Sequence, residues 1–167
     1  MKKRIKRTDG SVRYMTRAAM IASMYVALSY ISALFGLASG VIQFRLSEML
    51  CILPIFMPEA IPGLFIGCLL ANIVSGCLPW DIVFGSIATL IGALGCYALR
   101  NLPKKLLPLA ALPNLVSNCV IVPFVLIYAY GVPDGYFYLM LTVGIGELVC
   151  GVIGGSALGY SLKKVKI

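Results

Sequence analysis

The sequence predicts an all-α membrane protein with six transmembrane helices. Hydrophobic residues make up 60% of its 167 positions and charged residues only 12%, and the mean hydropathy is +0.98. Soluble domains carry about 25% charged residues, so this chain lacks the polar side chains that cover a surface in water. Its apolar residues also gather in long uncharged runs, which is the pattern of helices that cross a bilayer.

Five apolar runs are long enough to be predicted as spans, since a helix needs roughly 20 apolar residues to cross the hydrocarbon core. They cover residues 18–44, 60–80, 82–99, 106–133 and 135–162. The last run contains one carboxylate, Glu147. A sixth stretch, residues 46–57, is shorter and is interrupted by Pro54 and Pro58.

The basic residues decide how the short stretch is interpreted. All 14 Lys and Arg residues except Arg45 lie before the first run, in the connection at 100–105 or at the C-terminus. Basic residues collect in cytoplasmic segments, and six crossings place these three segments on one side of the membrane, whereas five separate the termini. We therefore predict that residues 46–57 cross the membrane and that both termini are cytoplasmic. The external loops are then residues 38–46, 76–81 and 131–136.

Residues 1–14 are predicted to form a basic segment in the cytoplasm, of which residues 1–13 are expected to be flexible, and residues 15–167 a single six-helix transmembrane domain. The first apolar run is too long for the hydrophobic region of a cleaved signal peptide. We expect no nucleic-acid partner, because such proteins spread basic residues over a folded face with stacking aromatic residues. Here the basic residues flank apolar runs, and the expected contact is with the lipid bilayer.

The sequence contains none of the motifs that would indicate an enzyme. It has no phosphate-binding G-x-x-x-x-G-K-[ST], no G-x-S-x-G nucleophile elbow and no H-E-x-x-H zinc motif. The six cysteines occur singly in apolar stretches and there is no histidine, so we expect no metal site and no cofactor. The chain is therefore predicted to be neither an enzyme nor an ATPase.

Polar residues at membrane depth are the candidate binding site, because burying a carboxylate in hydrocarbon is expensive and usually serves a function. Glu147 lies deepest, and Glu48 opens the short second helix with Ser47 as its predicted N-cap. In the six-span topology these residues fall towards the external side, which predicts a pocket open to the outside. The candidate set is Gln43, Phe44, Arg45, Glu48, Asn72, Trp80, Asp81, Asn118, Tyr128 and Glu147.

Structural roles remain open for several of these residues. Glu48 can be a helix-start charge paired with Arg45, and Trp80 can be an anchor at the membrane surface. Helix starts or interhelical hydrogen bonds account equally for Asp81, Asn72 and Asn118.

Small residues at every fourth position predict close contacts between helices in lipid. Two such stripes, expected to pack within the molecule, are Gly63, Gly67, Ala71 and Ser75, and Gly151, Gly155 and Gly159. Two shorter rows in the first helix are predicted to receive a partner subunit. These rows are Ala18 with Ala22, and Ala19 with Ser23 and Ala27.

Four segments of the chain, in order over residues 15–162, resemble the QueT family. They are Ile42-Gln43-Phe44-Arg45-Leu46-Ser47-Glu48, Pro62-Gly63-Leu64-Phe65-Ile66-Gly67 with Ala71-Asn72, Trp80-Asp81-Ile82-Val83-Phe84-Gly85-Ser86, and Gly144-Ile145-Gly146-Glu147-Leu148. QueT proteins are substrate-binding S components of energy-coupling factor transporters, and the family is assigned to the uptake of queuosine precursors, which are 7-deazaguanines. The N-terminal dozen residues lie outside the resemblance.

The resemblance implies a six-helix S component in the plasma membrane of a bacterium. It would capture its small-molecule substrate from outside and work with a transmembrane coupling subunit and two cytoplasmic ATPases. S components typically dock through small residues on the first helix, which matches the rows described above. A chain with a pocket but no ATPase motif fits this division of labour.

The residues also suggest how a 7-deazaguanine would be held. Glu147 is expected to accept both donors of the pyrimidine edge, and Glu48 or Asp81 to meet the amine of an aminomethyl-bearing precursor. The carbonyl would be addressed by Gln43, Asn72 or Asn118, and the flat ring would stack on Trp80, Phe44 or Tyr128.

Three other functions stay open. The substrate can be another vitamin, such as riboflavin or thiamine. The chain can be an autonomous proton-coupled carrier with Glu147 or Glu48 as its relay. It can also be a structural or lipid-interacting membrane protein without a small-molecule substrate.

Overall fold

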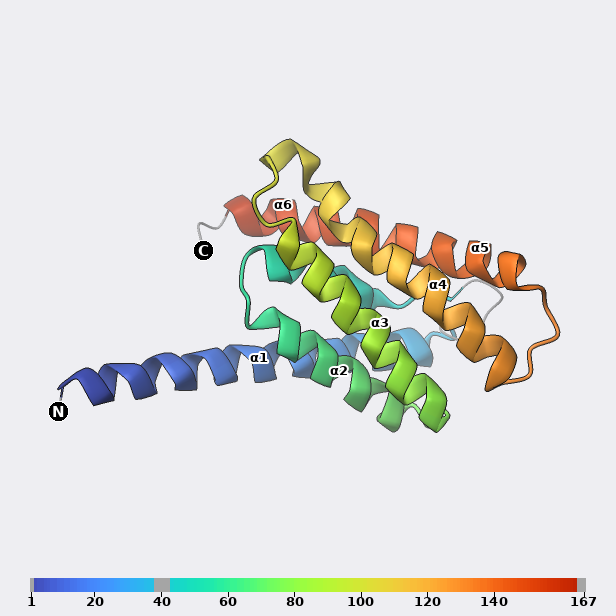
Figure 1. Ribbon diagram of the computed structural model, residues 1–167, viewed down its shortest axis with the longest axis horizontal. Coiled ribbons are helices and arrows are strands. Elements are labelled where there is room, and N and C mark those ends of the chain that lie inside the picture. The colour runs from blue at the N-terminus through green and yellow to red at the C-terminus, as the bar shows by residue number, and fades with distance from the viewer. Residues whose placement is uncertain (1, 38–42, 165–167) are drawn as a thin grey trace.

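The computed structural model describes residues 2–37 and 43–164, and the described part of the chain is a bundle of helices (Figure 1). The predicted all-α class is confirmed. The α-helices are α1 (Lys2–Leu34), α2 (Ala60–Val74), α3 (Pro79–Ala98), α4 (Leu112–Tyr128), α5 (Tyr136–Glu147) and α6 (Gly155–Lys164). Two 3₁₀ helices, η1 (Leu46–Ile55) and η2 (Lys104–Ala111), and the π-helical turn η3 (Leu148–Gly154) complete the fold. The predicted loop at 38–46 and the end of the predicted domain lie partly outside the described residues.

Each of the six predicted spans corresponds to a helical segment, but the segments differ in length. Within the described residues, four helical stretches are long and apolar enough to cross a membrane. They are Gly10–Leu34, Pro79–Ala98, Lys105–Tyr128 and Tyr136–Lys163. The helices η1 and α2 are apolar but shorter, so the six crossings stay a prediction.

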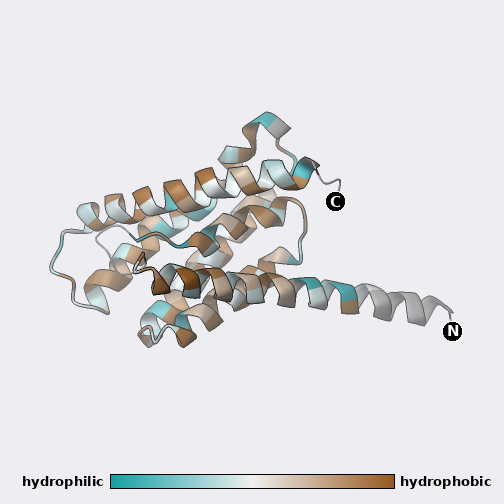
Figure 2. Cartoon of the chain, turned by 180° about the vertical axis from the view of Figure 1, so that it is seen from behind, coloured by the Kyte–Doolittle hydropathy of each residue, from teal (hydrophilic) through white to brown (hydrophobic). Residues whose placement is uncertain are grey.

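Both termini lie at the same end of the bundle as the basic connection between α3 and α4 (Figures 1 and 2). An even number of passes through the bundle produces this arrangement. The backbone of α1 is helical through residues 2–13, where the sequence predicted a flexible segment. The reason is local: this segment has no proline and is rich in Lys and Arg, which favour helix. Figure 1 shows that this part of α1 extends past the other helices.

The short helix η1 lies in the core of the bundle. Its residues Leu50, Cys51, Ile52 and Leu53 are buried, and it contacts α1, α3, α6 and η3. Pro54 lacks the backbone N–H that a longer helix would use. A segment that other helices surround need not reach both membrane surfaces as a regular α-helix. Its depth brings Glu48, in its first turn, into the interior.

The glycine stripes form close contacts within the molecule, as predicted. A Cβ at Gly63 would lie 2.7 Å from the carbonyl oxygen of Ala18, and a Cβ at Gly67 would lie 3.0 Å from the Cα of Ala22. The row of Ala18 and Ala22 is therefore covered by α2. Gly155 similarly lies against the backbone of Met49 in η1.

An ion pair joins α1 to the connection between η1 and α2. Arg17 Nη1 lies 2.8 Å from Glu59 Oε1. The hydrogen bond from Arg17 holds the pKa of the Glu59 carboxyl below its ordinary value. It is the only ion pair within the described residues.

Candidate functional site

Two buried carboxylates meet in the interior of the bundle. Glu48 lies in the first turn of η1, and Glu147 is the last residue of α5. Their exposed fractions are 3% and 8%. Between them lies Asn114 of α4, which is 1% exposed. Its amide nitrogen Nδ2 donates to Glu48 Oε2 at 2.9 Å and to Glu147 Oε2 at 3.1 Å. A single side-chain amide thus holds both acids.

Each carboxylate has further donors. Asn118, one turn along α4 from Asn114, donates from Nδ2 to Glu147 Oε1 at 2.9 Å. The phenol of Tyr25 on α1 donates to Glu48 Oε1, and the Cys51 thiol lies 3.3 Å from Glu48 Oε2. The acids are therefore solvated by neutral donors from α1, η1 and α4, as buried carboxylates require.

The start of η1 is tied to α1 rather than capped by Ser47. The Ser29 hydroxyl donates to the Ser47 hydroxyl at 2.8 Å, and the backbone N–H of Leu46 donates to Ser32 Oγ at 2.9 Å. The helix begins at Leu46, with Arg45 as its N-cap and no side-chain capping bond. The predicted N-cap role of Ser47 is wrong, because the residue lies inside η1 and its hydroxyl faces a neighbouring helix.

A second polar group lies towards the predicted external side. Arg45 Nη1 donates to Asn72 Oδ1 at 3.5 Å, and Asn72 Nδ2 donates to the backbone carbonyl of Asp81 at 3.4 Å. The Tyr130 hydroxyl donates to Asp81 Oδ2 at 3.0 Å. Within the described residues Arg45 forms no ion pair with Glu48, so the alternative of a helix-start pair is not seen.

A cavity of about 30 Å³ lies between the two polar groups. Its lining contains three carboxylates and one guanidinium, so acids outnumber bases. The lining residues are Gln43, Arg45, Glu48, Asp81, Gly85, Thr89, Asn118, Val122, Val143 and Glu147. We call this space the acidic cavity.

The acidic cavity adjoins a larger space near the connection between α4 and α5. That space has a volume of about 290 Å³ and shares Gln43 and Val143 with the acidic cavity as common lining. Asp134 and Tyr138 also line the larger space. The acidic cavity holds little more than a water molecule, so a larger molecule would enter only if lining side chains moved.

Six of the ten predicted site residues line the acidic cavity. They are Gln43, Arg45, Glu48, Asp81, Asn118 and Glu147. Asn72 lies next to it through its bonds to Arg45 and Asp81. Phe44 does not line the acidic cavity. Its backbone N–H donates to the Leu37 carbonyl at 2.9 Å.

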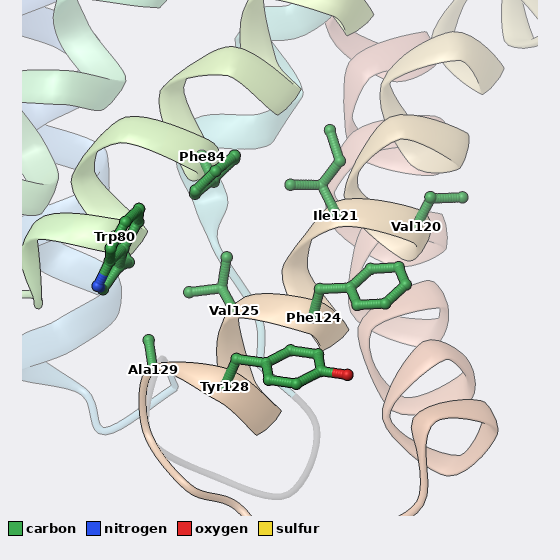
Figure 3. Close-up of a pocket in the computed structure, with 8 residues that line it drawn as sticks. All are labelled: Trp80, Phe84, Val120, Ile121, Phe124, Val125, Tyr128 and Ala129. Carbon is green, nitrogen blue, oxygen red and sulfur yellow. The ribbon is translucent and has the colours of Figure 1, made fainter.

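Trp80 and Tyr128 lie elsewhere, in an apolar groove of about 630 Å³ between α3 and α4. Figure 3 shows the two side chains on opposite sides of this groove. Trp80 is 64% exposed and Tyr128 is 82% exposed, and Trp80 stacks on Phe84 with ring centroids 5.9 Å apart. This placement matches the interfacial anchor that the sequence left open for Trp80.

Sequence reasoning missed Tyr25 and Asn114. Asn114 had a signal, because it precedes Asn118 by four positions and such residues share a helix face. Tyr25 had none, since a tyrosine in an apolar helix is ordinary and only the packing of α1 against η1 brings its hydroxyl to Glu48.

The small residues of α1 line a second groove, between α1 and α2, with a volume of about 860 Å³. All five predicted docking residues lie in it, but in two layers. Ala18 and Ala22 are buried at its floor, whereas Ala19, Ser23 and Ala27 are exposed. Figure 2 shows α1 along the near face of the bundle.

Comparison with known proteins assigns the chain to a family. The family model described as QueT transporter matches residues 15–164. The chain belongs to the QueT transporter family. It is therefore a multi-pass membrane protein of a transporter family, not of an enzyme family. The predicted resemblance to QueT is confirmed.

One curated relative adds detail to this family membership. The queuosine precursor transporter QueT of Lactococcus lactis subsp. cremoris (strain MG1363) is 36% identical over 74 residues. The aligned stretch covers 44% of this chain and 43% of the relative, so less than half of the relative's length is matched. No solved structure matches the chain.

Proposed function

We propose that this QueT family member is the substrate-binding S component of an energy-coupling factor importer, and that its substrate is a 7-deazaguanine precursor of queuosine. The observation that carries the proposal is the acidic cavity, where Glu48 and Glu147 are buried without a neutralising ion pair within the described residues. A ligand rich in hydrogen-bond donors stabilises such a site. The name of the Lactococcus lactis relative supports the substrate class.

The pyrimidine edge of a 7-deazaguanine presents two adjacent donors, the ring N–H and the exocyclic amine. One carboxylate accepts both in a bidentate pair. Glu147 is assigned to this edge, because Asn114 and Asn118 hold its two oxygens in place while each keeps a free lone pair. Gln43 or Asn118 would then address the carbonyl of the base.

An aminomethyl group on the same base adds a cation. Asp81 is assigned to it rather than Glu48, since Asn114 already ties Glu48 to Glu147, which is assigned to the pyrimidine edge. Asp81 comes from α3 and is held by Tyr130. The excess of acids over bases in the lining favours a cationic ligand.

The binding experiment uses the purified protein in detergent or nanodiscs. Mass spectrometry of the small molecules released on denaturation should identify a 7-deazaguanine. Titration calorimetry should give saturable binding of 7-aminomethyl-7-deazaguanine and no binding of riboflavin or thiamine. A protein that binds either vitamin and no deazaguanine would contradict the proposed substrate.

Energy coupling is tested separately, because a proton-coupled carrier would use the same acids. Vesicles that contain only this chain should not accumulate the deazaguanine, whereas vesicles that also contain the coupling subunit and ATPases should do so with ATP. Accumulation driven by a proton gradient alone would favour the carrier.

The proposed topology has six crossings with cytoplasmic termini. It is supported by the common end of the termini and the α3–α4 connection (Figure 1), and by the basic residues at that end. In a background without native cysteines, a cysteine at Asp134 should react with an impermeant reagent from outside intact cells. A cysteine at Lys105 should react only after the membrane is opened, and labelling of Lys105→Cys from outside would reverse the orientation.

A further inference from the structure

Asn114 is hydrogen-bonded to the two acids but does not line the acidic cavity. Glu48 and Glu147 both line it, and Asn114 donates to each of them. The residue joins α4 to η1 and to the end of α5, so one amide connects three elements. The two N–H groups of the amide are used on one oxygen of each carboxylate.

The orientation of this amide is set by its surroundings. If oxygen and nitrogen were exchanged, the amide oxygen would face two carboxylate oxygens. As placed, Oδ1 points at Gly92 of α3 and has no hydrogen-bond partner within the described residues, although it is buried. A buried acceptor without a partner is destabilising. The two hydrogen bonds from Nδ2 to the acids offset this cost and fix the orientation of the amide.

Glycine at position 92 makes room for the side chain. A Cβ there would meet Asn114 Oδ1 and would lie 2.6 Å from its Cα. One turn further along the same helix, a Cβ at Gly95 would lie 2.5 Å from Pro113 Cβ and would not meet Asn114. A side chain at either glycine would therefore disturb the contact of α3 with α4, but only a side chain at position 92 would displace the amide of Asn114.

We propose that Asn114 is a positioning residue that holds Glu48 and Glu147 at a set spacing for the ligand, without touching the ligand itself. The inference rests on the proposed function of the acidic cavity. Two carboxylates in a dry site repel each other, and charge-assisted hydrogen bonds from one shared donor offset that repulsion. Without the shared donor, the remaining donors hold each acid separately, and none of them sets the spacing between the two acids. These donors are Tyr25 and Cys51 for Glu48 and Asn118 for Glu147.

The test is a pair of double-mutant cycles on the dissociation constant of 7-aminomethyl-7-deazaguanine, measured by calorimetry. Asn114→Ala should weaken binding about ten- to a hundredfold. Its effect should be much smaller in the Glu48→Gln background and also in the Glu147→Gln background, because the shared geometry is already lost. Asn118→Ala is the matched control, since within the described residues Asn118 donates to Glu147 and not to Glu48. It should couple to Glu147 and be additive with Glu48.

The glycine pair provides a second route that leaves the amide chemically intact. Gly92→Ala should weaken binding and couple to both acids, whereas Gly95→Ala should lower thermal stability and leave the dissociation constant unchanged. This pair decides the matter if Asn114→Ala does not fold. Losses that are additive with both acids, or equal effects of the two glycine variants, would overturn the positioning role. A wild-type protein that binds no deazaguanine would overturn the proposed function and this inference with it.

Discussion

Glu147→Gln is expected to weaken the binding of a 7-deazaguanine about ten- to a hundredfold, because a hydrogen bond to a charged acceptor contributes on the order of 1.5–3 kcal/mol. The amide of Gln accepts one donor of the pyrimidine edge but turns a second donor towards the other. The fold should persist, because Gln has nearly the volume of Glu and its single amide oxygen still accepts from one of the two amides, Asn114 or Asn118, that now donate to separate oxygens of Glu147. Calorimetry with 7-deazaguanine measures the change, and thermal melting checks the fold.

The control is the same substitution at an acid outside the cavity. Glu59 is buried, but it pairs with Arg17 at the other end of η1 from Glu48. Glu59→Gln should leave the dissociation constant unchanged. If Glu147→Gln also binds as the wild type does, Glu147 has a structural role and the acidic cavity does not read the base edge through it.

Ser23→Trp is expected to reduce ATP-driven uptake on the order of tenfold or more, because overpacking a close helix contact costs about 1–3 kcal/mol. Ser23 is an exposed member of the α1–α2 groove, so its replacement fills the groove without disturbing the core. Ligand binding to the isolated protein should survive. Uptake in vesicles and co-purification of the coupling subunit measure the two effects.

Met24→Trp is the matched control for this experiment. Met24 is 50% exposed and adjacent in sequence, but it does not line the groove, so uptake should be unaffected. Ala22→Trp is less informative, since Ala22 packs on Gly67 and a large side chain there would separate α1 from α2. Normal uptake by Ser23→Trp would show that a coupling subunit does not use this face.

Hydropathy and charge in the sequence were enough to predict the helical segments. Each predicted run corresponds to a helical segment, because lipid requires that backbone hydrogen bonds be satisfied within the segment. A different rule, the cost of placing a carboxylate at membrane depth, identified Glu48, Asp81 and Glu147 as candidates. These properties belong to single segments and do not depend on how the segments pack.

The environment of each side chain depended on how helices rotate and approach one another, and only the tertiary structure decided it. Trp80 and Asp81 are neighbours in sequence, yet Trp80 lines the apolar groove between α3 and α4 and Asp81 lines the acidic cavity. Ala22 and Ser23 likewise divide between the core and the surface of α1. A turn of about 100° per residue, at 3.6 residues per turn, separates such neighbours. The joining of Glu48 to Glu147 through Asn114 needs contacts among three distant segments, and a pattern within one segment carries no record of such contacts.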